Sequence, residues 1–183
     1  MKAIAAVDRN WGIGMDGGLL ARLPSDMAYF REKTLGRTLI MGRKTLEGLP
    51  GGRPLAGRAT LLLSRDPAYR ADCEVFGSVE ACLARVAGLG ADEALVAGGA
   101  EIYRQFLPWC DECLITKIDA AFPADRHFEN LDESAAFQLA WEGEALSENG
   151  LSYRFSAYRR LGLGPGRAAA EGGACAGEGP WQG

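Results

Sequence analysis

Short apolar runs rich in β-forming residues alternate with helix-forming segments through most of this 183-residue chain. Continuous apolar strands are typical of a parallel sheet covered on both faces, and helices between the strands supply that cover. We therefore expect an α/β fold: a doubly wound, mostly parallel central sheet with helices on both faces. The strand-like runs are residues 2–7, 38–41, 59–63, 93–97 and 113–118, and the helical segments are residues 26–34, 79–86 and 101–106.

The pattern changes toward the C-terminus. Two segments of alternating polar and apolar residues, 137–142 and 151–158, flank Glu148-Asn149-Gly150, and Asn-Gly is a strong hairpin signal. We expect these two segments to form an antiparallel hairpin at the edge of the sheet. Residues 162–183 are rich in Gly and Ala and have one aromatic residue, so a disordered tail is predicted there. Residues 1–161 are then expected to form one domain.

The charge balance points to a small-molecule partner. The formal net charge is -4, and the chain contains no block of Lys or Arg. We therefore expect neither nucleic acid nor an anionic membrane as a partner. The apolar run at residues 3–7 is too short for a signal peptide or a transmembrane helix, which predicts a cytoplasmic protein.

Five cysteines are an odd number in a chain long enough to bury a core, so we expect free thiols rather than a disulfide framework. Cys110 and Cys113 have the spacing of a redox pair. A thioredoxin-type pair follows a strand and opens a helix, whereas this one follows a helical segment and leads into a strand. His127 is the only histidine and there is no second cysteine pair, so we expect no metal site.

Asp26 lies at the start of a predicted helix, close in projection to Phe30, with Met27 and Thr34 completing an apolar face that Arg31 does not join. One interpretation is an acid that complements the helix dipole. The other is an acid lining an apolar pocket, where desolvation would raise its pKa toward a range useful for proton transfer.

Two predicted strands are each followed by glycine and a helix start, at Gly42-Arg43-Lys44-Thr45 and at Gly98-Gly99. Such turns suit phosphate binding, although glycine also ends strands for steric reasons. Neither turn matches G-x-G-x-x-G or a P-loop. Arg43, Lys44 and Arg65 could converge on a phosphate monoester if their strands are neighbours; the alternative is three solvated charges. The glycine-rich loop 12–18 could close over a ligand or be an ordinary connection.

Taken in order, the motifs of residues 1–161 resemble those of dihydrofolate reductases. The motifs that carry the resemblance are Ala5-Ala6-Val7-Asp8, Trp11-Gly12-Ile13-Gly14, Leu23-Pro24-x-Asp26-Met27-x-x-Phe30, Met41-Gly42-Arg43-Lys44-Thr45, Gly52-Arg53-Pro54-Leu55-x-Gly57-Arg58, Leu63-Ser64-Arg65, Gly98-Gly99-x-x-Ile102-Tyr103 and Asp125-x-His127-Phe128. The resemblance implies reduction of dihydrofolate to tetrahydrofolate, with NADPH as cofactor. A monomeric enzyme is expected.

The resemblance also implies substrate contacts. Asp26 would hold the pteridine ring and promote protonation at N5, and it would be the catalytic residue. Arg58 would clamp the α-carboxylate of the glutamate tail, since a guanidinium bonds a carboxylate at two points, with Arg53 assisting. The remaining implied substrate residues are Ile4, Met27, Phe30, Leu49 and Thr116.

The implied cofactor contacts fall into groups. Ala6 and Ile13 would flank the nicotinamide, Thr45 and a cis Gly98-Gly99 turn would hold the pyrophosphate, and Ser78 and Gln105 would lie near adenine. Arg43, Lys44, Ser64 and Arg65 would surround the 2'-phosphate. The full implied set is Ala6, Gly12, Ile13, Gly14, Met15, Asp16, Gly17, Gly18, Arg43, Lys44, Thr45, Ser64, Arg65, Gly77, Ser78, Gly98, Gly99, Ala100, Glu101, Ile102, Tyr103 and Gln105.

One position departs from the family pattern. Ala21 stands where the family usually has a tryptophan that covers the pterin and helps to organise water near the acid. Two alternatives therefore stay open: a catalytically weak paralogue that binds NADPH or a pterin, and a related reductase of riboflavin synthesis. Asp26, Phe30 and Arg58 suit an acyl-glutamate pterin better than the riboflavin-pathway alternative.

Overall fold

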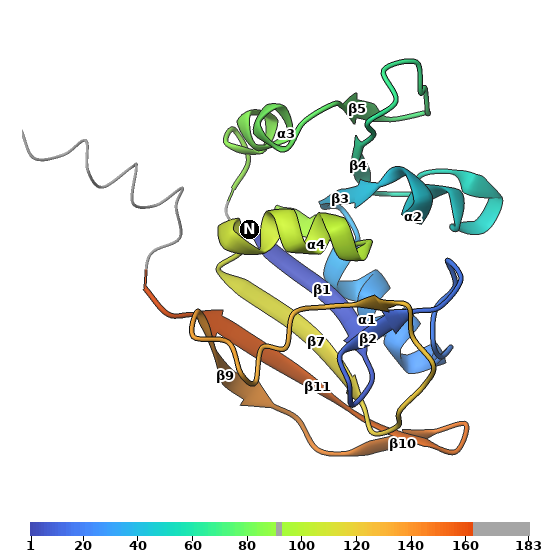
Figure 1. Cartoon of the computed structure of the whole chain (residues 1–183), viewed down its shortest axis with the longest axis vertical. Helices are drawn as coiled ribbons and strands as arrows, with labels where there is room; N and C mark the ends of the chain where they lie inside the picture. The colour runs from blue at the N-terminus through green and yellow to red at the C-terminus, as the bar shows by residue number, and fades with distance from the viewer. Residues whose placement is uncertain (91–92, 163–183) are drawn as a thin grey trace, which may run out of the picture.

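A nine-stranded mixed sheet forms the centre of the computed structural model, which describes residues 1–90 and 93–162 (Figure 1). The strands are β1 (Lys2–Val7), β3 (Thr38–Gly42), β4 (Ala59–Leu63), β5 (Glu74–Phe76), β6 (Ala94–Val96), β7 (Glu112–Ile118), β9 (Phe137–Glu142), β10 (Leu146–Glu148) and β11 (Leu151–Arg160). Their order is β10-β11-β7-β1-β6-β3-β4-β5, and β9 also pairs with β11. The strand-like runs of the sequence all lie in this sheet.

The sheet is parallel from β7 to β5. β1 pairs in parallel with β6 and β7, and β3 pairs in parallel with β6 and β4. The side chains of Leu39, Ile40 and Met41 in β3 are almost completely buried, as expected for an inner strand covered on both faces. The predicted fold class is confirmed.

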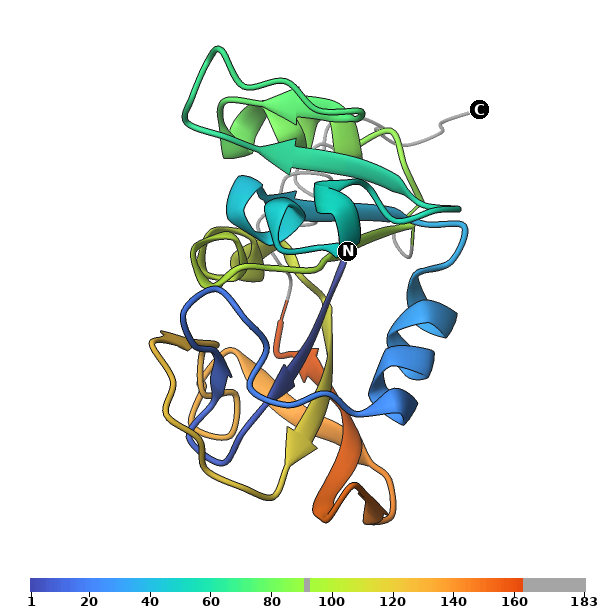
Figure 2. The ribbon, with the colours of Figure 1, turned by 90° about the vertical axis from the view of Figure 1, so that its right-hand side faces the viewer.

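Helices cover both faces of the sheet (Figure 2). One hydrophobic cluster contains Met41 and Leu62 and packs against Phe30 of α1, while the other contains Ile40 and packs with Cys82 of α3 and Phe106 of α4. The helices are α1 (Pro24–Thr34), α2 (Arg43–Glu47), α3 (Val79–Val86) and α4 (Ala100–Phe106), with 3-10 turns η1 (Pro50–Gly52) and η2 (Leu107–Trp109). Ser78 caps α3, because its hydroxyl oxygen accepts a hydrogen bond of 3.2 Å from the Ala81 amide.

The antiparallel edge is present, but its hairpin differs from the prediction. Asn149 and Gly150 both have positive φ, as the turn signal requires. The strand across that turn from β11 is β10, which the sequence analysis missed, and the predicted partner β9 pairs farther along with residues 156–160. β10 was hard to find because it has only three residues and is mostly exposed.

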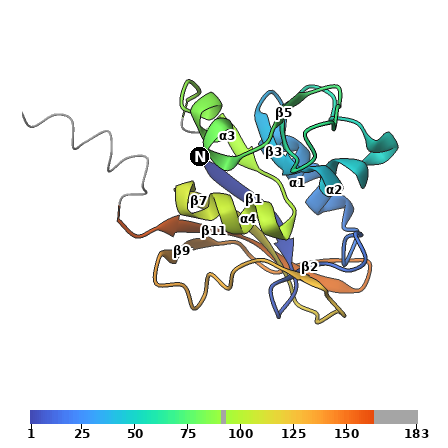
Figure 3. The same ribbon diagram turned by 45° about the horizontal axis from the view of Figure 1, so that its top comes forward.

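The glycine-rich N-terminal loop is partly ordered by pairing. β2 (Gly12–Gly14) pairs with β8 (Arg126–His127), and an isolated bridge joins Met15 to Gly18. Figure 3 shows β2 beside the carboxyl end of β1. The loop is thus fastened to a segment more than 100 residues away in the chain, a contact that the sequence pattern did not indicate.

The predicted tail falls almost entirely outside the described residues, because residues 163–183 are not among them. No helix within residues 1–90 and 93–162 is long and apolar enough to cross a membrane.

We expect the Leu62→Ala variant to lose about 2 to 5 kcal/mol of unfolding free energy, because the Leu62 side chain of β4 is fully buried. Urea denaturation followed by circular dichroism measures this loss. The matched control is Leu139→Ala at a residue that is 47% exposed, where little change is expected. A similar loss in both variants would contradict the burial of β4.

Candidate active site

Four parallel strands end at one edge of the sheet, and predicted site residues follow three of them. Arg43 follows β3, Ser64 follows β4, and Gly98 comes two residues after β6, while Asp8, which was not predicted as a site residue, follows β1. Ligands of open α/β sheets bind outside the carboxyl ends of the strands, so this edge is the expected place for a site. The parallel pairing of β3 with β4 and β6 brings together the two glycine turns and the Ser64 loop.

Asp26 lies in the first turn of α1 and is 8% exposed. Its carboxylate Oδ1 accepts a hydrogen bond of 2.6 Å from the Thr116 hydroxyl on β7. Burial raises the pKa of Asp26 above its ordinary value, and the hydrogen bond from Thr116 acts in the opposite direction. The acid is therefore desolvated and oriented, in agreement with the second of the two interpretations drawn from the sequence.

The apolar residues around Asp26 divide into buried and open ones. Ile4 is 5% exposed, and Phe30 and Leu49 are partly buried against its cluster. Met27 is 42% exposed, so the apolar face predicted for α1 is buried at Thr34 and open to solvent at Met27. α1 turns Asp26 and Thr34 inward and leaves Met27 open to solvent.

Two aromatic residues that the sequence analysis did not select lie beside this acid. Phe155 on β11 is directly opposite Thr116 in the antiparallel register. The ring of Tyr29 from α1 stacks on Phe155 with a centroid distance of 4.2 Å. Only the register between β7 and β11, which the sequence pattern does not fix, could have identified Phe155.

Ala21 belongs to the same hydrophobic cluster as Phe155 and Phe122 and is partly buried there. Asp26 keeps its low exposure with alanine at this position. Loss of the expected indole has therefore not left the acid open to solvent in this structure.

Arg58 carries an unsatisfied donor. Its Nε atom is buried without a hydrogen-bond partner among the described residues. Burial lowers the pKa of Arg58, and the positive charge of Arg31 adds to the effect. Arg31 is exposed, in agreement with its predicted place off the apolar face of α1. A buried donor without a partner beside a second cation suits an anionic ligand group. Arg53 is exposed.

The two glycine turns meet. The Gly42 amide donates a hydrogen bond of 2.9 Å to the Gly98 carbonyl oxygen, and the Gly98-Gly99 peptide bond is cis, as the resemblance implies. A Cβ atom on Gly42 would lie 3.0 Å from the Ile102 side chain, and Gly98 has a φ of 120°. Glycine is favoured at position 42 by the close approach of α4 to β3, and at position 98 by the positive φ.

Of the three cations after β3 and β4, Arg43 lies close to two carboxylates and an aromatic ring. The Arg43 guanidinium lies 3.7 Å from the Glu47 carboxylate, 3.8 Å from the Asp66 carboxylate and 5.5 Å from the centre of the Tyr69 ring. Lys44 and Arg65 are exposed. The sequence analysis predicted the cations and missed these carboxylates.

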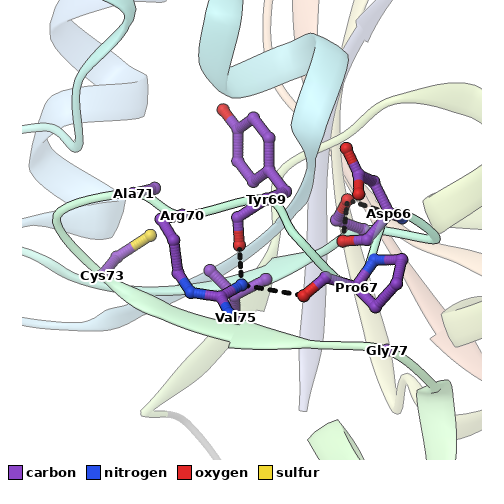
Figure 4. Close-up of a pocket in the computed structure, with 9 residues that line it drawn as sticks. Asp66, Pro67, Tyr69, Arg70, Ala71, Cys73, Val75 and Gly77 are labelled. Carbon is purple, nitrogen blue, oxygen red and sulfur yellow. Dashed lines mark hydrogen bonds between the residues drawn. The ribbon is translucent and has the colours of Figure 1, made fainter.

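Predicted cofactor residues border two pockets. A pocket of about 310 Å³ lies at the β4–β5 end and is lined by Ser64, Asp66, Pro67, Tyr69, Arg70, Ala71, Cys73, Val75 and Gly77 (Figure 4). A second pocket of about 310 Å³ is lined by Ala100, Glu101, Tyr103, Arg104, Leu107, His127, Phe128 and Glu129. Each pocket thus combines predicted residues with others that the sequence did not indicate.

The other predicted cofactor residues are spread along the same edge. The Tyr103 hydroxyl donates a buried hydrogen bond of 2.6 Å to the Ile4 carbonyl oxygen, and Ile102 is buried against the sheet. Glu101 is exposed and pairs with Arg104 and Gln105. Ala6, Ile13 and Thr45 are partly buried, Gly12 and Gly14 are buried, and Met15, Asp16, Gly17, Gly18, Gly77 and Ser78 are exposed.

Asp8 is a buried acid whose role the sequence analysis missed. It is 3% exposed, and its carboxylate accepts hydrogen bonds from the amides of Asn10 and Gly12, both 2.8 Å, and of Phe122, 2.9 Å. Asp8 therefore ties the start of the N-terminal loop to the segment before β8. An aspartate right after an apolar strand was the available signal.

The cysteines of the described residues are free thiols, and Cys175 lies outside that part of the chain. Cys110 and Cys113 are buried, and burial raises the pKa of Cys110 to about 12. These thiols are poor nucleophiles at neutral pH. Within the described residues, no three His, Cys, Asp or Glu side chains are arranged to hold a metal ion.

Comparisons with known proteins agree with this geometry. The family model described as dihydrofolate reductase matches residues 1–160. A dihydrofolate reductase from Neisseria meningitidis serogroup A is 39% identical over 158 residues, which cover 86% of this chain and 96% of that protein. One from Mycobacterium tuberculosis is 38% identical over 157 residues, covering 81% and 90%.

A solved structure is also similar. The dihydrofolate reductase from Enterococcus faecalis, complexed with NADP(H), has a TM-score of 0.76 and 30% sequence identity, and the match covers 87% of this chain and 95% of that one. The family match spans every strand of the sheet and both glycine turns. The chain therefore belongs to the dihydrofolate reductase family of NADPH-dependent oxidoreductases.

Proposed function

We propose that this chain reduces 7,8-dihydrofolate to 5,6,7,8-tetrahydrofolate with NADPH, and that Asp26 is its catalytic residue. The observation that carries the proposal is the desolvated Asp26 carboxylate, held by Thr116 at the strand edge where the glycine turns meet. A buried acid with a raised pKa is suited to proton transfer near neutral pH.

The residues at the edge fit a dinucleotide cofactor. The turns at Gly42 and Gly98 are joined by a hydrogen bond just before the starts of α2 and α4, and Arg43 and Arg65 supply positive charge after β3 and β4. When bound, NADPH supplies the hydride that is added to C6 of dihydrofolate. In this proposal Thr45 and the Gly98-Gly99 turn hold the pyrophosphate.

Asp26 has two tasks in the proposed mechanism. Its carboxylate accepts hydrogen bonds from the 2-amino group and N3 of the pteridine, which orients the ring, and Thr116 fixes the carboxylate. Asp26 also promotes transfer of a proton, through water, to N5. The remaining substrate residues, Ile4, Met27, Phe30 and Leu49, would wall the pteridine and the ring that follows it.

Arg58 would bind the carboxylate of the glutamate tail. Its buried Nε lacks a partner, and a carboxylate would satisfy that donor and screen its repulsion from Arg31. Arg53 would assist from the exposed loop.

We also propose that residues 1–161 form the functional domain, that the enzyme acts as a monomer in the cytoplasm, and that it uses no nucleic-acid partner. The net charge of -4 supports the last point. Size-exclusion chromatography with light scattering tests the monomer.

We expect Asp26→Asn to lower kcat/KM for dihydrofolate about 100-fold or more at neutral pH, because the amide cannot promote protonation. In the unsubstituted protein, activity should fall as pH rises through the raised pKa of Asp26, and this limb should disappear in the variant. Steady-state NADPH oxidation measures both effects.

The control for Asp26 is Asp119→Asn, an exposed carboxylate paired with Arg9, which should keep the activity and its pH profile. If the unsubstituted protein oxidises NADPH no faster than Asp26→Asn, the proposed reaction is wrong.

Joint replacement of Arg43, Lys44 and Arg65 by Ala should weaken binding of NADPH much more than binding of NADH, because only NADPH has the 2'-phosphate. Fluorescence titration gives both dissociation constants, and Arg159→Ala, whose side chain is 70% exposed, serves as a control. Equal losses for the two cofactors would show that these charges do not contact the phosphate.

A catalytically weak paralogue is the second candidate, and Ala21 is the observation that favours it. If the missing indole limits substrate binding, Ala21→Trp should tighten dihydrofolate binding by about 1 to 3 kcal/mol and raise kcat/KM. Combining Ala21→Trp with Asp26→Asn should remove the gain in rate. No gain in the single variant would mean that neighbouring residues already replace the indole.

A further inference from the structure

The Asp66 carboxylate lies where it can compete with a cofactor phosphate. Its Oδ2 atom is 3.8 Å from Nη1 of Arg43, the cation assigned above to the 2'-phosphate. Glu47 contacts the same guanidinium from α2, and the Tyr69 ring lies beside it. The charge of Arg43 is therefore partly neutralised by two carboxylates of the protein.

Asp66 is fixed by its own loop rather than by Arg43 alone. Its Oδ1 atom accepts a hydrogen bond of 2.9 Å from the Ala68 amide, which closes a tight turn. The Asp66 amide donates a hydrogen bond of 3.2 Å to the Ser64 hydroxyl. The backbone of Asp66 is thus held beside Ser64, which is also assigned to the 2'-phosphate. Figure 4 shows the loop that carries Asp66.

The 2'-phosphate of a bound cofactor and the Asp66 carboxylate would both be anions close to Arg43. The phosphate carries between one and two negative charges near neutral pH, so it is repelled by Asp66 and must share Arg43 with it. The 2'-hydroxyl of a cofactor without this phosphate has no such conflict. In many dinucleotide sites an acid accepts a hydrogen bond from that hydroxyl.

We propose that Asp66 is a specificity-determining residue that weakens binding of the 2'-phosphorylated cofactor and so narrows the preference for NADPH over NADH. This inference rests on the proposed function, because it requires Arg43 to face the 2'-phosphate. In this proposal Arg43, Lys44 and Arg65 make NADPH the preferred cofactor, and the charge of Asp66 limits how much more tightly NADPH binds than NADH.

Asp66→Asn tests the proposal, because the amide oxygen can keep the bond to Ala68 while the charge is removed. The dissociation constants of NADPH and NADH are measured on the full chain by fluorescence titration at low salt and at about 0.5 M salt. We expect NADPH to bind about 3- to 10-fold more tightly at low salt, with a smaller gain at high salt. NADH should bind unchanged or more weakly.

Two further variants sharpen the test. Asp72→Asn removes an exposed carboxylate elsewhere in the same loop and should leave the ratio of the two dissociation constants unchanged. Asp66→Ser removes the charge and keeps a hydroxyl that can close the turn, so it replaces Asp66→Asn if that variant does not fold.

The outcomes separate this inference from the proposed function. If the unsubstituted protein binds NADPH and Asp66→Asn binds it equally or less tightly, the role of Asp66 is refuted while the cofactor assignment stands. A gain of the same size for NADPH and NADH also refutes it. If the unsubstituted protein binds neither cofactor, the proposed function fails and the inference fails with it.

Discussion

The parallel pairing of β1, β6, β3 and β4 is the constraint on which the rest of the structure depends. Parallel strands place their carboxyl ends at one edge, so residues separated by more than 50 positions in the chain become neighbours there. The Gly42–Gly98 hydrogen bond is a direct result of the pairing between β3 and β6. Glycine at position 42 also lets the Ile102 side chain of α4 lie against β3, since a Cβ atom there would be 3.0 Å from it.

Burial gives Asp26 its chemical character. A carboxylate at a helix start is ordinarily stabilised by the helix dipole and by water, but α1 presents Asp26 to the sheet, where Thr116 is its hydrogen-bond donor. The resulting rise in pKa follows from desolvation, which outweighs that hydrogen bond. The stacked rings of Tyr29 and Phe155 are close by, so aromatic residues from α1 and β11 supply apolar surface near a position where Ala21 supplies little.

Arg58 and Arg43, the two arginines proposed to bind anionic groups, have different charged neighbours. Arg58 has a buried donor without a partner among the described residues and the charge of Arg31 nearby, so the anion proposed to bind there would not have to displace a carboxylate from that donor. Arg43 instead has Glu47 and Asp66 as neighbours before any ligand arrives. Partial neutralisation reduces repulsion among the cations in the free protein, and it also reduces the attraction that remains for a phosphate.

The sequence by itself determined the fold class, the positions of most inner strands and helices, and the acid, glycines and cations of the candidate site. Burial and close backbone approach can be predicted from short stretches of sequence, because apolar runs indicate buried strands and glycine indicates close approach. The order of the motifs along the chain carried the family resemblance. Tertiary structure alone decided the pairing of β10 with β11, the position of Phe155 opposite Thr116, the exposure of Met27, and the contacts of Asp8 and Asp66. Strand register and the approach of distant charges depend on how the whole chain packs, because the energies of these contacts arise between residues that no local pattern connects.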